Sequence, residues 1–103
     1  MVTNKIDISA SHISEGVRNA IGLAFEQYSE HPHSVHLNYF HMTWFLQNEK
    51  PRREDYIVEE SKVCVLHKSP TGYVLVHFDP ECKEREGFIF LERKNLKIEL
   101  VLP

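Results

Sequence analysis

The densest group of chemically active side chains is the segment HPHSVH at residues 31–36, which holds His31, His33 and His36. Imidazole is a common zinc ligand, and a catalytic zinc site needs three protein ligands and an open position. Imidazoles also titrate near neutral pH, which suits a pH-sensitive element. In a strand, however, His33 and His36 point to opposite faces, and neither HExxH nor CxxC occurs in the chain. A metal site is therefore the alternative, and an exposed joint after a helix is the favoured interpretation.

A second candidate site follows from the register of a predicted hairpin. The runs 62–67 and 73–78 are rich in Val, Leu and aromatics, and the sequence SPTG between them has Pro and Gly where a type I turn prefers them. A turn centred on its two middle residues puts Cys64 opposite His77, with Cβ atoms about 4.5–5.5 Å apart. A thiol beside an imidazole is the minimal unit of a cysteine nucleophile. The alternative is that Cys64 is a buried, unreactive side chain.

Acidic side chains gather in the predicted loops and at strand ends, and they are candidate contacts for a partner: Glu54, Asp55, Glu59, Glu60, Asp79, Glu81, Glu84 and Glu86. An acidic rim of this kind can steer and orient a basic partner. Trp44 is added to this set of candidate contact residues. The competing interpretation is a solvated surface of mixed charge.

Composition narrows the class of protein. The chain has 103 residues, 42% of them apolar and 26% charged, which predicts one globular domain spanning residues 1–103. A net charge of −3 gives no basic footprint for nucleic acid. No apolar run approaches the roughly 20 residues of a membrane helix, and the first residues lack the apolar core of a secretory signal. A small secreted domain often carries several disulfides, whereas this chain has two cysteines, which are expected to be reduced thiols. A cytoplasmic location is therefore expected. Phosphate-loop and dinucleotide motifs are absent, and no cofactor is expected.

One segment has a clear helical period, with apolar residues on one face at Ile13, Val17, Ala20, Ile21, Ala24 and Tyr28. Ser11 is the expected N-cap, and Pro32 is expected to end the helix. Segment 34–47 is ambiguous, because it can be divided into apolar stripes as a strand or as a helix. We favour a strand there because aromatic residues are frequent in it.

The remaining apolar runs predict strands. Residues 87–92 and 96–102 form a second hairpin, and residues 56–59 and 4–9 are expected to be short strands. The predicted fold is α+β, with one N-terminal amphipathic helix packed on a mainly antiparallel sheet of about five strands.

Several of the predicted strands are apolar on both faces, which a sheet with one wet face would not be. The runs are 63–66, 73–76 and 88–91. One helix covers one face, so segment 34–47, a curled part of the sheet or a second polypeptide must cover the other. A large exposed apolar surface usually marks an interaction site. This favours self-association or a protein partner.

The predicted function is a small non-catalytic interaction protein, of the inhibitor or immunity type that binds and occludes a partner. The alternative is a small metal-dependent or Cys/His-dependent enzyme of hydrolase type. A third option is an apolar ligand site between sheet and helix, lined by Phe40, Trp44 and Tyr73.

Overall fold

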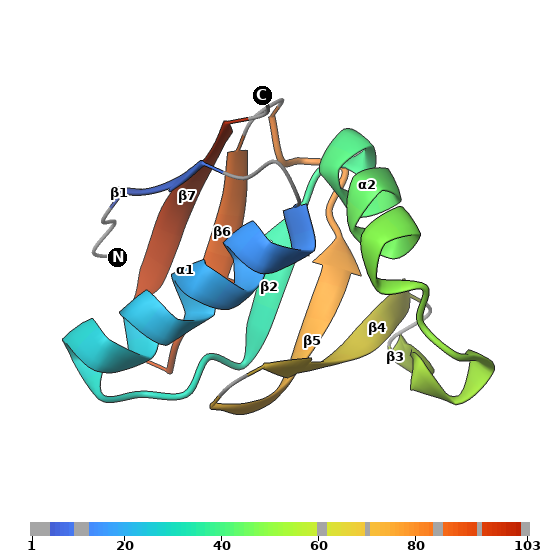
Figure 1. Ribbon diagram of the computed structural model, residues 1–103, viewed down its shortest axis with the longest axis horizontal. Coiled ribbons are helices and arrows are strands. Elements are labelled where there is room, and N and C mark those ends of the chain that lie inside the picture. Colours follow the sequence, from blue (N-terminus) through green and yellow to red (C-terminus); the bar gives the residue numbers. More distant parts are fainter. Residues whose placement is uncertain are drawn as a thin grey trace.

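Both helices of the protein lie on one face of a seven-stranded sheet, as seen in a computed structural model (Figure 1). The structure describes residues 5–9, 13–59, 62–69, 71–83, 86–92 and 94–101. The strands are β1 (Lys5–Ser9), β2 (Ser34–Leu37), β3 (Tyr56–Glu59), β4 (Lys62–Ser69), β5 (Gly72–Phe78), β6 (Glu86–Phe90) and β7 (Asn95–Val101). The helices are α1 (Ile13–Tyr28) and α2 (Tyr39–Glu49), and a short 3-10 turn, η1 (Arg53–Asp55), precedes β3. The α+β class is confirmed.

The sheet is mixed, with the strand order β1-β7-β6-β2-β5-β4-β3. Two neighbouring pairs are parallel, β1 with β7 and β2 with β5, and the other four pairs are antiparallel. We expected one helix and about five mainly antiparallel strands, whereas the structure has two helices and seven strands. The parallel pairs join strands that are far apart in the sequence, so no local turn pattern predicts them.

Helix α1 buries the predicted face. Ile13, Val17, Ala20, Ile21 and Ala24 are at most 2% exposed, and Tyr28 packs at the edge of the core. The helix ends at Tyr28 rather than at Pro32, because Ser29 adopts a left-handed φ of 54°. The predicted N-cap, Ser11, lies outside the described residues.

Segment 34–47 is a strand only over Ser34–Leu37, so the strand favoured for its remainder was wrong. Asn38 stops the strand and caps helix α2, since its Oδ1 accepts the backbone N–H of His41 at 2.8 Å. Lys50 closes the helix in a left-handed conformation with φ 47°. The helical period was hidden because α2 carries apolar side chains on its inner and its outer side. The inner side buries His41, Met42 and Phe45.

Both predicted hairpins are present. In the first, Cys64 pairs with His77 and His67 with Val74, as the proposed register requires. Gly72 has φ 136° where the turn enters β5, and Pro70 of that turn lies outside the described residues. In the second, β6 and β7 pair from Phe90 and Asn95 outward. The short strands predicted at 56–59 and 4–9 are β3 and β1.

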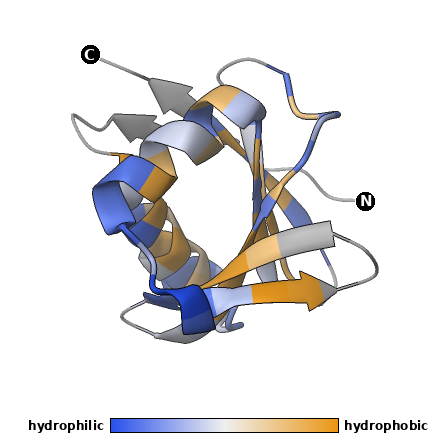
Figure 2. Cartoon of the chain, turned by 90° about the vertical axis from the view of Figure 1, so that its right-hand side faces the viewer, coloured by the Kyte–Doolittle hydropathy of each residue, from blue (hydrophilic) through white to orange (hydrophobic). Residues whose placement is uncertain are grey.

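The core lies between the helices and one face of the sheet. Val35, Leu37, Val76, Ile89 and Ile98 project from the sheet into it and are fully buried. Figure 2 shows both helices on the same side of the sheet, so α2 does not cover the second face as one of our alternatives required. No element of the described residues covers that second face, which we call the open face. Its half-buried residues include Ser34, His36, Leu66, Leu75, His77, Phe88, Phe90 and Lys97.

Candidate functional site

The three histidines of HPHSVH do not share a site. His31 contacts the β4–β5 turn, where its Nε2 lies 2.6 Å from the carbonyl oxygen of Tyr73 and its Nδ1 lies 3.0 Å from Oγ1 of Thr71. His33 is exposed, and His36 belongs to the open face. Within the described ranges, no group of three or more His, Cys, Asp or Glu side chains could hold a metal ion. The joint therefore has a structural role at His31, which positions the hairpin.

Cys64 and His77 are opposite one another, but their setting does not suit a nucleophile. Cys64 is fully buried, and its thiol donates to the carbonyl of its other neighbour, Ile57, at 3.5 Å. Cys82 is also buried, and burial together with the charge of Asp79 raises the pKa of its thiol to about 12. A reactive cysteine needs an accessible thiolate, and the thiols of Cys64 and Cys82 are both buried.

The acidic candidates that the structure describes do not form one rim. Glu54 is exposed and Asp55 half-buried on η1, beside the end of α2, while Asp79 and Glu81 follow β5, beside the beginning of α2. Glu86 forms an ion pair with Lys97 of β7. The side chain of Glu59, and residues Glu60 and Glu84, lie outside the described part. Among the acidic candidates that the structure describes, Asp79 and Glu81 are those beside the apolar surface described next.

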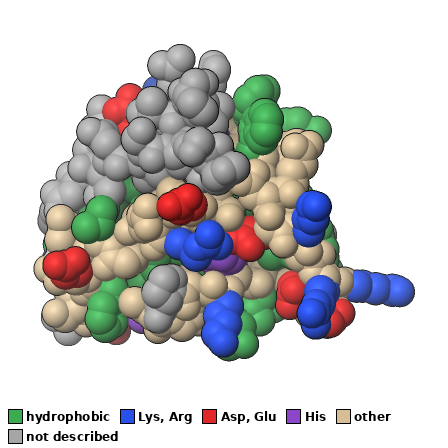
Figure 3. Space-filling model, in the orientation of Figure 1, with side chains coloured by type: hydrophobic (Ala, Val, Ile, Leu, Met, Phe, Trp, Pro, Cys, Tyr) green, Lys and Arg blue, Asp and Glu red, His purple; other side chains and the backbone are tan. Residues whose placement is uncertain are grey.

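Four aromatic side chains stand out from the surface at the start of α2 and the end of β5. Tyr39 is 72% exposed, Phe40 57%, Trp44 46% and Phe78 40%. We call them the aromatic patch. Tyr39 and Phe78 meet edge to face at 5.8 Å, and with Phe40 and Pro80 they line an open pocket of about 350 Å³. In Figure 3, hydrophobic side chains gather at the upper right, where α2 lies.

Sequence reasoning named Phe40 and Trp44 and missed Tyr39 and Phe78. The signal was the narrow polar face of α2, where Thr43 and Gln47 are exposed beside three aromatic side chains, since a helix this apolar is normally covered on more than one side. The predicted ligand site between sheet and helix is wrong, because Phe40 and Trp44 point away from the sheet and Tyr73 is 60% exposed.

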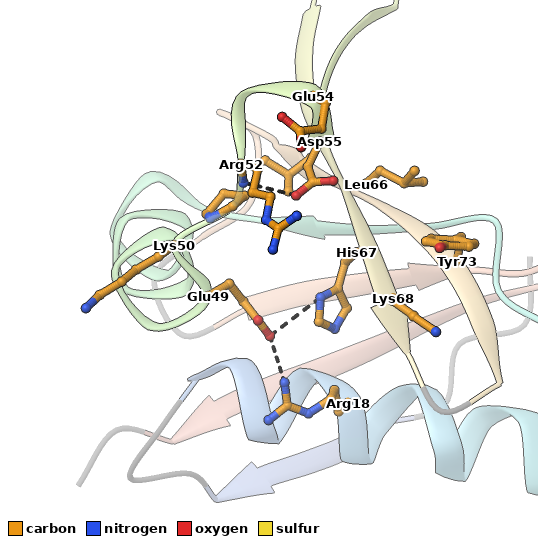
Figure 4. Close-up of a pocket in the computed structure, with 12 residues that line it drawn as sticks. Arg18, Glu49, Lys50, Arg52, Glu54, Asp55, Leu66, His67, Lys68 and Tyr73 are labelled. Carbon is orange, nitrogen blue, oxygen red and sulfur yellow. Dashed lines mark hydrogen bonds and ion pairs between the residues drawn. The ribbon is translucent and has the colours of Figure 1, made fainter.

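A polar pocket of about 380 Å³ lies between the end of α2, η1 and β4 (Figure 4). At its base, one oxygen of Glu49 lies 2.7 Å from Nη1 of Arg18 and 3.5 Å from Nδ1 of His67. His67 is only 6% exposed, and burial lowers its pKa despite the opposing effect of Glu49. Its Nε2 is buried without a hydrogen-bond partner. Arg52 points into the same pocket from the start of η1.

The open face carries a second polar cluster, which sequence reasoning did not find. Oγ of Ser34 lies 3.1 Å from Nε2 of His36, and Nδ1 of His36 lies 3.1 Å from Oδ2 of Asp79. The three residues come together because β2 and β5 run parallel, with Leu37 beside Phe78. Asp79, which follows Phe78, therefore lies beside the end of β2.

Comparison with models of protein families, with curated proteins and with solved structures found no match to this chain. Neither helix in the described residues has the length and apolar character that crossing a membrane requires.

Proposed function

We propose that the protein is a small interaction module of the inhibitor or immunity type, which docks on a partner protein through the aromatic patch. The observation that carries this proposal is the outer side of α2, where Tyr39, Phe40 and Trp44 are all turned to solvent. Tyrosine and tryptophan are enriched among the residues that contribute most binding energy at protein interfaces. A helix with aromatics on both sides is suited to being sandwiched between its own core and another surface.

The charges beside the patch suggest the chemistry of the partner. Asp79 and Glu81 border the patch from the turn after β5, and Lys83 is the exposed cation nearest along that loop. A partner that places an apolar side chain on Tyr39 and Phe78, with an Arg or Lys beside it, would match both features. Charge complementarity of this kind contributes mainly to association rate and specificity.

A cytoplasmic location is part of the proposal. Its support is that Cys64 and Cys82 are both buried thiols that form no disulfide. Free thiols persist where the cell keeps them reduced.

The test uses two matched variants of the whole chain. The patch variant carries Tyr39→Ser, Phe40→Ser and Trp44→Ser, and the control carries Val58→Ser and Tyr73→Ser, which are exposed apolar side chains outside the patch. Each protein is immobilised, incubated with lysate of the source cells, and its bound proteins are identified by mass spectrometry.

We expect one protein to be retained by the wild type and the control and to be lost by the patch variant. Circular dichroism verifies that all three are folded. Sedimentation at increasing concentration determines whether the chain pairs with itself instead. Equal capture by the patch variant, or a dimer that survives all three substitutions, would contradict the proposal.

A further inference from the structure

We propose that Ser34 is an activated nucleophile that accepts acyl groups from small apolar esters, with His36 as its base and Asp79 as a positioning residue. The inference uses none of the four side chains of the aromatic patch, although Asp79 also borders that patch. Its starting point is the pair of 3.1 Å contacts that join Ser34 to Nε2 of His36 and Nδ1 of His36 to Asp79. The same order of groups activates serine in unrelated hydrolase folds, where it is recognised by geometry rather than by position in the sequence.

The carboxylate fixes the tautomer of the imidazole. Because the Asp79 oxygen can only accept, Nδ1 of His36 carries the hydrogen and donates to it. Nε2 is then the acceptor, and it faces the hydroxyl of Ser34. This leaves the lone pair of Nε2 directed at the one proton whose removal makes Ser34 nucleophilic.

The base is held in place by its surroundings. The His36 ring lies 4.3 Å from that of Phe90 and 4.7 Å from that of His77, with which it stacks. Asp79 is fixed as well, because its N–H donates to the carbonyl of Leu37 at 2.8 Å and its Oδ1 accepts the N–H of Glu81 at 2.9 Å. The side chains of His36 and Asp79 are 23% and 26% exposed, so both are partly accessible to solvent.

The neighbours of Ser34 define the substrate class. Across the sheet, Ser34 is paired with Phe90 on β6 and with Leu75 on β5. Both are half-buried on the open face, and they favour an apolar acyl group. The strand of Ser34 is paired on both sides, so its backbone N–H groups are used by the sheet and do not form an oxyanion hole. Since such donors contribute about 10²–10³ in rate, slow turnover and activated esters are expected.

The reaction balances with water as the second reactant. Oγ of Ser34 attacks the ester carbonyl carbon while His36 takes its proton at Nε2. The bond from that carbon to the leaving oxygen breaks, and His36 returns the proton to the leaving alcohol. Water, deprotonated by His36, then attacks the acyl carbon, the Oγ–C bond breaks, and His36 returns the proton to Oγ, which releases the acid and restores the hydroxyl.

The test combines a fluorophosphonate probe, which labels activated serines, with release of 4-nitrophenol from 4-nitrophenyl butyrate. We expect label on Ser34 in peptide mass spectra and a slow release of 4-nitrophenol, both abolished by Ser34→Ala. Asp79→Asn keeps the shape of the side chain but should lower labelling at least about tenfold, as in other triads. His33→Gln, a change at an exposed histidine outside the cluster, should leave labelling unchanged.

The pH dependence of labelling tests whether His36 acts as the base. Labelling of the wild type should fall on acidification, because a protonated imidazole cannot take the Ser34 proton. His36→Gln should label at a low, pH-independent rate. Labelling of Ser34 that is equal in wild type and His36→Gln, or no label on the folded wild type at any pH, would overturn the proposal.

Discussion

His67 of β4 and Glu49 of α2 meet across the edge of the core, with Nδ1 of the histidine 3.5 Å from Oε1 of the carboxylate. The same oxygen accepts from Nη1 of Arg18 at 2.7 Å. One carboxylate thus connects α1, α2 and the sheet. The Phe45 ring lies edge to face against His67 at 5.2 Å and contributes to the burial that lowers the pKa of the histidine.

The first prediction is a loss of stability in acid. Burial lowers the pKa of His67 below its ordinary value of 6.5, so between the folded-state pKa and this ordinary value the unfolded chain binds more protons than the folded one. The free energy of unfolding should therefore decrease as pH falls through about 6.5 and level off below the folded-state pKa. The slope between the two pKa values is at most about 1.4 kcal/mol per pH unit. Urea denaturation at pH 7.5 and pH 5.5 measures it.

The control for this prediction is a pair of histidine variants. His67→Gln should flatten the pH dependence, whereas His33→Gln, at an exposed position, should retain it. An unchanged slope in His67→Gln would assign the acid sensitivity to another group.

The second prediction concerns His31 and Gly72. The His31 ring contacts the β4–β5 turn at Thr71 and Tyr73. His31→Ala removes both hydrogen bonds and should lower the free energy of unfolding by about 1–2 kcal/mol. Gly72→Ala should also destabilise, because φ is +136° there and a Cβ would lie 3.3 Å from the His31 ring.

A double-mutant cycle separates the two causes. His31→Ala removes the ring that the new Cβ would meet but leaves the strained φ, so the double variant should cost less than the sum of the single variants. Strict additivity, measured by chemical denaturation, would show that the ring contact contributes nothing.

The parts of the fold that could be predicted are those specified by neighbouring residues. The apolar period of α1 was readable because that helix buries only one face, and the register of Cys64 with His77 followed from a two-residue turn. The pairing of β2 with β5 was not readable, because no local signal links strands so far apart in the chain. That pairing alone brings Asp79 to His36, so the Ser34 cluster was hidden with it.

Helix α2 was missed for a different reason. Its inner side carries Phe45 and its outer side carries Phe40, so the polar strip at Thr43 and Gln47 is too narrow to reveal the period. The sequence predicted apolar side chains on both faces of the sheet and left open what covers the second face. It did not indicate that aromatic side chains of a helix would be exposed as well.

The third prediction tests the two sides of α2 against each other. Phe45 is fully buried, and Phe45→Ala should lower the free energy of unfolding by about 3–5 kcal/mol. Phe40 is 57% exposed, and Phe40→Ala should change it by no more than about 0.5 kcal/mol. Denaturant titration of both variants measures the difference. A large loss in Phe40→Ala would mean that the aromatic patch stabilises the fold rather than serving a partner.

The last prediction is that neither thiol reacts in the folded protein. Cys64 is fully buried, and a pKa of about 12 leaves Cys82 almost entirely protonated at pH 8. Iodoacetamide should modify neither residue in native protein and both after unfolding in urea. Burial is the main cause at Cys82 and the charge of Asp79 comes second, so Asp79→Asn should accelerate its modification only slightly. Rapid labelling of Cys64 in native protein would restore the Cys64–His77 pair as a candidate nucleophile.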